Sequence, residues 1–305
     1  MKTLVRAHGE PLGTGTIRTT PEDFVVTELY DFTPTGQGEH LLLWIEKRGA
    51  NTGWVANQLA NHFGLRHFDV SYCGKKDRHA VTRQWFSCWL PNGGDATPCE
   101  IEGVQILKST WHSKKLRRGE HAGNHFELTI RDLQVADPSA LEKRLTVISQ
   151  QGVPNYFGSQ RFGIDGQNYE KACELLNDPE AQSRRKLDRK QKDIYLSALR
   201  SWMFNDALTE AVAAGSWTDQ DELWVYGLAP HRDIEVPRPG AEYAAAADFI
   251  EKLQIKAHRR ATRIQPENMQ WQISAGTLQV AFSLPVGAYA TTVLEELIKI
   301  EDGHQ

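Results

Sequence analysis

Residues 70–90 read Val-Ser-Tyr-Cys-Gly-Lys-Lys-Asp-Arg-His-Ala-Val-Thr-Arg-Gln-Trp-Phe-Ser-Cys-Trp-Leu, a charged loop between two apolar segments. The segment that ends at Cys73 and the one that starts at Arg83 are rich in aromatic and β-branched residues, which favours strands. Gly74 permits a sharp exit from the first strand. The stretch therefore predicts a sheet that carries an exposed loop around Asp77, and reactive groups are often held on such loops.

Further strands are expected on both sides of this stretch, at Asp23–Glu28, His40–Glu46 and His125–Leu133. A helix is expected from Asn51 to Gly64, because Val55, Leu59 and Phe63 repeat at helical spacing. A second helix is expected from Pro138, a first-turn proline, to about Gly152.

The middle of the chain is helical in character, with helices expected at Tyr169–Asn177, Ile194–Ala214 and Ala241–Leu253. The end returns to strand character, since Met269–Leu284 alternates around Gly276. Pro285 then opens a final amphipathic helix that carries Leu297 and Ile298. We therefore expect an α+β protein with a discontinuous domain, residues 1–150 and 263–305, interrupted by a helix-rich domain, residues 151–262.

The composition restricts the class of protein. With 305 residues, 40% of them hydrophobic and nine of them Trp, the chain can build a core, which excludes wholesale disorder. No apolar run reaches the roughly 18 residues of a membrane-spanning helix, and the N-terminus lacks the apolar segment of a secretory signal. The four cysteines form no CxxC pair and no metal-ligand spacing. We expect a reduced, cytoplasmic, metal-free protein.

The basic residues are clustered, although the net charge is −4. Three short stretches, residues 75–83, 112–121 and 184–192, hold 14 of the 35 Lys and Arg residues and only three acids. One such stretch alone is typical of a solvated face. Three together favour contact with a nucleic-acid backbone, because the local potential governs such contacts.

Asp77 is the candidate reactive group. Its neighbours Lys75, Lys76 and Arg78 favour the ionised carboxylate, which suits a nucleophile or the anchor of an ion pair better than a general base. A solvated turn is the alternative. A phosphate-binding loop is excluded, since Asp69 and Lys76 stand where Gly and Ser or Thr are required. His62 and His67 do not have the spacing of a metal pair.

Three other stretches gain meaning beside this loop. Phe24 is either a core residue or a base-stacking face, and Asn124 is either a turn residue or a ligand contact. The segment Asn155-Tyr-Phe-Gly-Ser-Gln-Arg-Phe-Gly163 combines three aromatic residues with Arg161, which favours a loop that contacts nucleotides.

These motifs together resemble the TruD family of tRNA pseudouridine synthases. The similarity is carried, in order along the chain, by Pro21-Glu-Asp-Phe-Val-Val, Gly74-Lys-Lys-Asp-Arg-His-Ala-Val-Thr-Arg-Gln84, Gly123-Asn124, the segment 155–163 and Leu284-Pro-Val-Gly-Ala-Tyr-Ala-Thr. The resemblance implies a pseudouridine-synthase domain with a mixed, mainly antiparallel sheet, interrupted by a helix-rich insertion (TRUD) domain. It also implies isomerisation of uridine at position 13 of tRNA without metal or cofactor.

The same resemblance assigns roles to residues. Asp77 matches the catalytic aspartate, and Phe24, Asn124 and Tyr289 match the positions that hold the target base. Contacts with RNA are expected from Arg18, Lys75, Lys76, Arg78, Gln84 and Arg161. Tyr289 stands where Phe is expected, so stacking is retained while a hydroxyl is added, and the helical middle is shorter than in relatives.

The expected partner is tRNA, and we expect a monomer. A non-catalytic tRNA-binding or chaperone module remains an alternative, since it would carry the same basic stretches. A small-molecule hydrolase with an aspartyl nucleophile is a third interpretation, which leaves the basic stretch 184–192 without a role.

Overall fold

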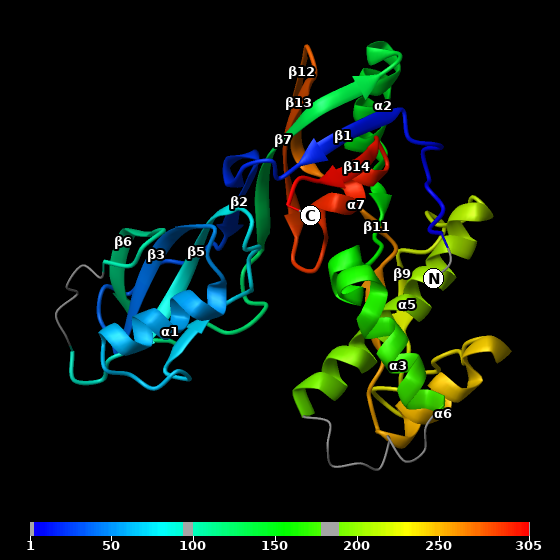
Figure 1. Ribbon diagram of the computed structural model, residues 1–305. Coiled ribbons are helices and arrows are strands. Elements are labelled where there is room, and N and C mark those ends of the chain that lie inside the picture. The colour runs from blue at the N-terminus through cyan, green and yellow to red at the C-terminus, as the bar shows by residue number, and fades with distance from the viewer. Residues whose placement is uncertain (1–2, 94–99, 178–188, 305) are drawn as a thin grey trace. The chain divides into compact units, whose positions relative to one another are not determined.

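The computed structural model describes residues 3–93, 100–177 and 189–304 (Figure 1). The chain divides into two compact units. The sheet unit comprises residues 11–149, 266–287 and 297–305, and the helical unit comprises residues 1–10, 150–265 and 288–296. Each unit is therefore assembled from three separate segments of the chain.

The sheet unit is built on one ten-stranded sheet. Its strands are β1 (Gly13–Ile17), β2 (Phe24–Leu29), β3 (His40–Arg48), β4 (Val70–Tyr72), β5 (Val81–Trp89), β6 (Val104–His112), β7 (Gly123–Val135), β12 (Glu267–Ser274), β13 (Thr277–Pro285) and β14 (Lys299–Asp302). The main path is β12-β13-β7-β2-β5-β3-β6, with β1 joined to β7 and β14, and β4 joined to β5. Two pairs, β1–β14 and β2–β5, are parallel and the other pairs are antiparallel. The expected α+β class with a mixed, mainly antiparallel sheet is confirmed.

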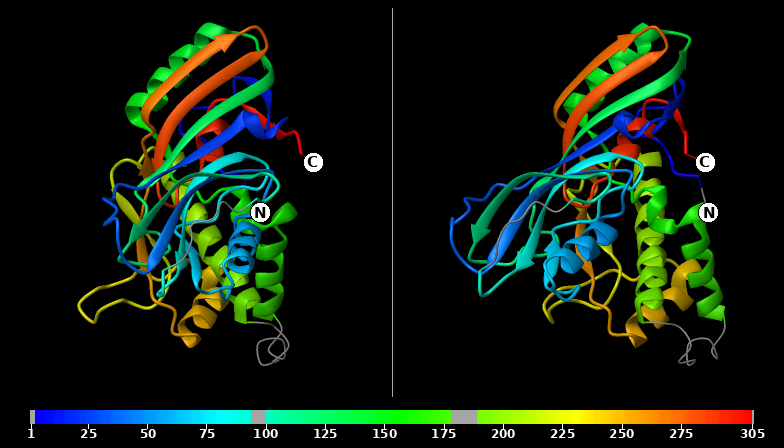
Figure 2. Two further views of the ribbon diagram at one scale, coloured as in Figure 1. Left: turned by 90° about the vertical axis from the view of Figure 1, so that its left-hand side faces the viewer. Right: turned by 60° about the vertical axis from the view of Figure 1, so that its left-hand side comes forward.

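Two helices cover parts of this sheet. Helix α1 (Thr52–His62) begins where the side chain of Asn51 accepts a hydrogen bond from the Gly53 amide. Val55 and Leu59 on its inner face pack against buried residues of β3 and β5, as the apolar spacing predicted. Helix α2 (Pro138–Gln151) buries Leu141, Leu145 and Ile148 and lies along β7, β12 and β13 (Figure 2). A short 3₁₀ turn, η1 (Pro21–Asp23), precedes β2.

The helical unit contains α3 (Gln167–Asn177), α5 (Arg189–Ala213), α6 (Ala244–Lys252) and α7 (Ala290–Glu295), with 3₁₀ turns η2 (Ser159–Phe162), η3 (Ile164–Gly166) and η4 (Ala241–Tyr243). Two small ladders pair β8 (Val153–Pro154) with β11 (Arg263–Ile264), and β9 (Glu222–Val225) with β10 (His258–Ala261). The three helices expected in this region are confirmed within a few residues at their ends. The N-terminal segment joins this unit, because the Glu296 carboxylate accepts from the amides of Ala7 and His8.

The C-terminus differs from the expectation. The final helix ends at Glu295, and residues 299–302 form β14, which pairs with β1 in parallel register. Leu297 and Ile298 are fully buried. The apolar pattern of this segment therefore identified core residues, but these lie at a junction between a helix and a strand. Among the described helices, none is long and apolar enough to cross a membrane.

Candidate active site

The Asp77 loop connects β4 to β5 and is fixed to its surroundings at three points. The Lys47 ammonium donates to the carbonyl oxygen of Asp77 at 2.8 Å. The Lys76 amide donates to the Thr52 hydroxyl oxygen at 3.0 Å. The Gln84 amide nitrogen donates to the Gly74 carbonyl oxygen at 2.9 Å. The loop is therefore a rigid platform, and this suits a catalytic side chain.

Lys47 and Gln84, which bind the loop through these hydrogen bonds, are completely buried. Burial lowers the pKa of Lys47 to about 8, against the opposing effect of the Asp77 charge. Gln84 accepts from Thr52 as well as donating to Gly74. Lys47 carries no sequence signal of this role, because a single charged residue at the end of a strand is ordinarily solvated.

The Asp77 carboxylate is paired with Arg18. The Arg18 guanidinium donates to Oδ2 of Asp77 at 2.7 Å and to Oδ2 of Asp302 at 2.9 Å. Its side chain is 5% exposed, whereas that of Asp77 is 23% exposed. Burial strengthens charge-assisted hydrogen bonds of this kind. Arg18 also has a φ of 56°, a conformation that non-glycine residues rarely adopt, so the surrounding structure holds it.

Arg18 therefore supplies a cation to Asp77 from outside the loop. Lys75 and Arg78 are exposed. Lys76 is buried and donates instead to Oε1 of Glu28 at 3.0 Å and to Oδ1 of Asn124 at 2.6 Å. The hydrogen bonds of the Lys76 side chain therefore belong to a second network, separate from the ion pair between Arg18 and Asp77.

Asn124 is placed by this second network. It lies directly opposite Glu28 in the β2–β7 ladder, and its amide oxygen accepts from Lys76. This contact assigns the amide oxygen to the Lys76 side, so the NH₂ group is on the other side of the amide. Glu28 also accepts from the Trp85 amide at 3.1 Å. Burial raises the pKa of Glu28, and the Lys76 charge opposes that rise.

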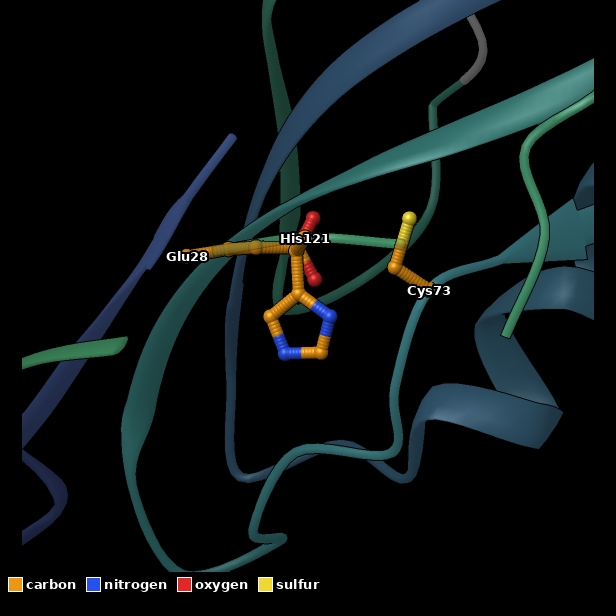
Figure 3. Close-up of side chains that lie close together, drawn as sticks. All are labelled: Glu28, Cys73 and His121. Carbon is orange, nitrogen blue, oxygen red and sulfur yellow. The ribbon is translucent and has the colours of Figure 1, made fainter. Parts of the chain in front are cut away.

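Glu28, Cys73 and His121 converge from three separate segments, with ligand-type atoms within 4.8 Å of one another (Figure 3). Burial raises the pKa of the Cys73 thiol to about 12. Burial, together with the Lys76 charge, lowers the pKa of His121 to about 4. A metal ion here would meet the Lys76 ammonium already bonded to Glu28, so the donor set is poorly suited to a cation. The cluster is better described as a buried support for Lys76.

Phe24 supports Arg18. The guanidinium carbon lies 4.1 Å from the centroid of the Phe24 ring, a cation–π contact. Phe24 is only 4% exposed, and its ring meets that of Phe126 edge-on at 6.3 Å. In this structure Phe24 is therefore buried and packs against the guanidinium that pairs with Asp77.

Tyr289 and Arg161 belong to the helical unit. Tyr289 is half-buried at the start of α7, beside Gly158, where an added Cβ would lie 3.0 Å from the Tyr289 ring. Arg161 donates to the Ser201 hydroxyl at 3.2 Å. The guanidinium carbon of the partly buried Arg260 lies 3.9 Å from the centroid of the Phe157 ring. Burial lowers the pKa of Arg260 to about 10. The electrostatic effect of Tyr289 raises this pKa, whereas the charge of Arg161 lowers it further.

The aromatic residues of the segment 155–163 are core residues. Tyr156, Phe157 and Phe162 are each at least nine-tenths buried and belong to one hydrophobic cluster with α5. The expectation that they face nucleotides is wrong for these three rings. The polar residues between them satisfy backbone groups, as when Asn155 donates to the Ala261 carbonyl oxygen, so the mixed composition reflects hydrogen bonding inside the core.

Two of the basic stretches adjoin in the sheet unit. The Gly119 amide donates to the Cys73 carbonyl oxygen at 2.8 Å, which brings residues 112–121 against the start of the Asp77 loop. The exposed cations of the two stretches include Lys75, Arg78, Lys114, Arg117 and Arg118. Most of the third stretch, residues 184–192, lies outside the described residues.

Known proteins resemble this chain over nearly its whole length. The family model described as tRNA pseudouridine synthase D (TruD) matches residues 5–178. The tRNA pseudouridine synthase D of Cellvibrio japonicus is 40% identical, covering 97% of this chain and 93% of its own. That of Xanthomonas euvesicatoria is 39% identical, covering 98% and 95%. The crystal structure of the putative tRNA pseudouridine synthase D from Methanosarcina mazei has a TM-score of 0.66 at 18% identity, covering 96% of this chain and 95% of that one, which shows a shared fold.

Proposed function

Because the chain belongs to the TruD family of tRNA pseudouridine synthases, we propose that it isomerises uridine to pseudouridine at position 13 of tRNA. Asp77 is the catalytic carboxylate in this proposal, and neither a metal nor a cofactor takes part. The observation that carries it is the ion pair between Asp77 and the buried Arg18 on a loop fixed at three points. The hydrogen bond from Arg18 orients this carboxylate, and a nucleophile or a sugar-proton acceptor must be oriented in this way.

The reaction rearranges bonds within one nucleoside. The bond from the sugar carbon C1′ to N1 of uracil breaks, and a bond from C1′ to C5 forms. Asp77 either attacks C1′ and is later displaced by C5, or accepts the proton from C2′ in an elimination and returns it. The proton on C5 is then lost to a base and N1 gains a proton, so substrate and product are isomers and no electrons leave the nucleoside. The balance therefore requires no redox partner, which supports the proposal that no cofactor takes part.

The target base must leave its stack, which costs a few kcal/mol. Asn124 is suited to the polar edge of uracil, since its NH₂ group is the one directed away from Lys76. Phe24 and Tyr289 remain proposed contacts of the base, through the positions at which the family holds it. Gln84 is fully buried, so we do not include it among the proposed RNA contacts.

Binding of tRNA is proposed to use the exposed cations of residues 75–83 and 112–121, which adjoin in the sheet unit. Binding should then weaken steeply with salt, because each phosphate contact releases counterions. We further propose that residues 151–262 act as the inserted TRUD domain and contribute Arg161. The protein is proposed to work in the cytoplasm, as a monomer and without a metal.

The decisive test compares Asp77→Asn with Asp31→Asn, which changes an exposed acid of the same unit. Each purified variant is incubated with unmodified tRNA, and pseudouridine is mapped by reverse transcription after carbodiimide treatment. Wild type and Asp31→Asn should give a stop at position 13, and Asp77→Asn should bind tRNA without giving one. A stop from Asp77→Asn would end the assignment of Asp77. Binding without any stop in wild type would favour the non-catalytic module.

A further inference from the structure

A cavity of about 680 Å³ lies beside the Asp77 loop in the sheet unit. Its walls come from the end of β3, the first turns of α1, the loop residue Arg78 and residues 100–103. The side chains that bear on its chemistry are Arg48, Trp54, Gln58, Arg78, Glu100 and Glu102. Of these, only Arg78 is an expected RNA contact, and the motifs used for the proposed reaction assign no ligand to the rest of the cavity.

The cavity is fixed in position relative to Asp77. The buried Lys47 ammonium donates both to the carbonyl oxygen of Ala50, in the cavity wall, and to that of Asp77, each at 2.8 Å. Thr52, in the first turn of α1, accepts from the Lys76 amide at 3.0 Å. A group bound in the cavity would therefore keep a constant distance from the Asp77 loop, as the neighbour of a reacting nucleotide requires.

Trp54 gives the cavity an exposed aromatic surface. Its exposed fraction is 43%, although α1 buries Val55 and Leu59 on its core face. The core packing of α1 therefore does not account for a tryptophan at this position. A half-exposed indole at the edge of a cavity is suited to stack against a base, and such stacking tolerates every base.

The charged groups around the cavity are of both signs. Arg48 is paired with Glu22 at 2.7 Å. Arg78 is exposed and forms no ion pair within residues 3–93, 100–177 and 189–304. Glu100 and Glu102 are exposed acids that would repel a bare phosphate and accept hydrogen bonds from the amino group of a base.

We propose that this cavity binds one nucleotide of the substrate RNA near the target uridine, and that it favours a base with an exocyclic amino group. The base stacks on Trp54, its amino group donates to Glu100 or Glu102, and its phosphate meets Arg78. The proposal rests on the proposed function, since it adds a second nucleotide contact beside the Asp77 loop. It makes the cavity a determinant of which RNA is accepted.

The kinetic test uses Trp54→Ala and Trp54→Phe, with Phe68→Ala as the matched control. Like Trp54, Phe68 is an exposed aromatic residue, and the Arg66 guanidinium lies over its ring. Phe68 does not line the cavity. Trp54→Ala should raise the KM for tRNA by about 5- to 150-fold and leave kcat close to wild type. Trp54→Phe should recover most of the loss, and Phe68→Ala should behave as wild type. Thermal unfolding confirms that each variant is folded.

A binding test uses nucleotides in place of tRNA. The indole N–H signal of Trp54, identified by its loss in Trp54→Phe, is followed by NMR during titration with adenosine 5′-monophosphate, uridine 5′-monophosphate or inorganic phosphate. Adenosine monophosphate should shift the signal at lower concentration than uridine monophosphate, and phosphate should not shift it. Arg78→Gln should reduce the slope of log K against log salt for tRNA by about one.

Three results would overturn the proposal: an unchanged KM in folded Trp54→Ala, a Trp54 signal insensitive to adenosine monophosphate, or an equal response to phosphate alone. None of these touches the proposed function, which fails instead when wild type forms no pseudouridine. An unchanged KM with wild-type pseudouridine formation would thus reject the cavity and keep the enzyme.

Discussion

Replacing His121 by leucine should remove one source of acid sensitivity from the sheet unit. His121 is buried, and its Nδ1 has no hydrogen-bond partner among the described residues. Burial and the Lys76 charge lower its pKa to about 4 in the folded protein, from an ordinary value of 6.5. Between pH 6.5 and about pH 4 the unfolded chain therefore binds a proton that the folded chain excludes. Stability contributed by this group is complete above pH 6.5 and is lost as the pH falls.

The magnitude follows from these two pKa values. Lowering the pH from 7 to 5 should cost the wild type about 2 kcal/mol of unfolding free energy through His121 alone. The assay is equilibrium urea unfolding of the full chain at both pH values. The variant His121→Leu should lose less stability than wild type by that amount. The loss of unfolding free energy between pH 7 and pH 5 is compared between wild type and variant. The contribution of distant titrating groups is the same in both and cancels.

His62→Gln is the control, because it removes an exposed imidazole from the same unit. It should follow the wild-type dependence on pH. If His121→Leu loses as much stability between pH 7 and pH 5 as wild type does, the folded protein does not exclude the proton from His121, and the description of a buried support around Lys76 is refuted.

Arg18→Gln removes the cation of Asp77 and Asp302 and should lower the single-turnover rate of pseudouridine formation by about 10- to 100-fold, while Arg18→Lys keeps the charge and should lose less. A rate unchanged in Arg18→Gln would show that Asp77 does not need its partner. Glu28→Gln leaves the Lys76 ammonium buried without its carboxylate and should cost about 3–5 kcal/mol in urea unfolding, against no measurable change for the exposed Glu301→Gln. Gly152→Ala should lower Tm more than Gly276→Ala. Both glycines have φ near +70°, but only at Gly152 would a Cβ lie 2.3 Å from a carbonyl oxygen, that of Ile264. Equal shifts in Tm would reject the steric explanation.

The elements of this fold were predictable where their pattern is local. Helix α1 follows from the Asn51 cap and the spacing of Val55 and Leu59, and the hairpin β12–β13 follows from alternation around Gly276. Strand β14 was missed because it pairs with β1, which lies almost the whole chain away. No local signal separates Leu297 and Ile298 in a helix from the same residues at a junction, since both arrangements bury them.

The site was predictable to the same extent. Asp77 stands out because a lone acid among cations follows a strand. Its partner Arg18 is 59 residues away and meets it only through the fold. Lys47 and Asp302 carry no sequence signal of their roles, because single charged residues at strand ends are ordinarily solvated. The aromatic rings of the segment 155–163 were expected to be exposed because polar residues stand between them. Polar residues do not indicate exposure when their hydrogen bonds are satisfied inside the core.

Adjacent residues of the loop serve two separate charge networks, and this separation bears on catalysis. Lys76 is committed to Glu28 and Asn124, whereas Asp77 is committed to Arg18, which is in turn divided between two carboxylates. A change at Lys76 should therefore act mainly on the orientation of the Asn124 amide, and a change at Arg18 mainly on the Asp77 carboxylate. In the proposed reaction, the amide that contacts the base and the catalytic carboxylate are thus held by two different cations. Thr52 and Lys47 fix the backbone of residues 76 and 77, which keeps the two networks in a constant position relative to each other.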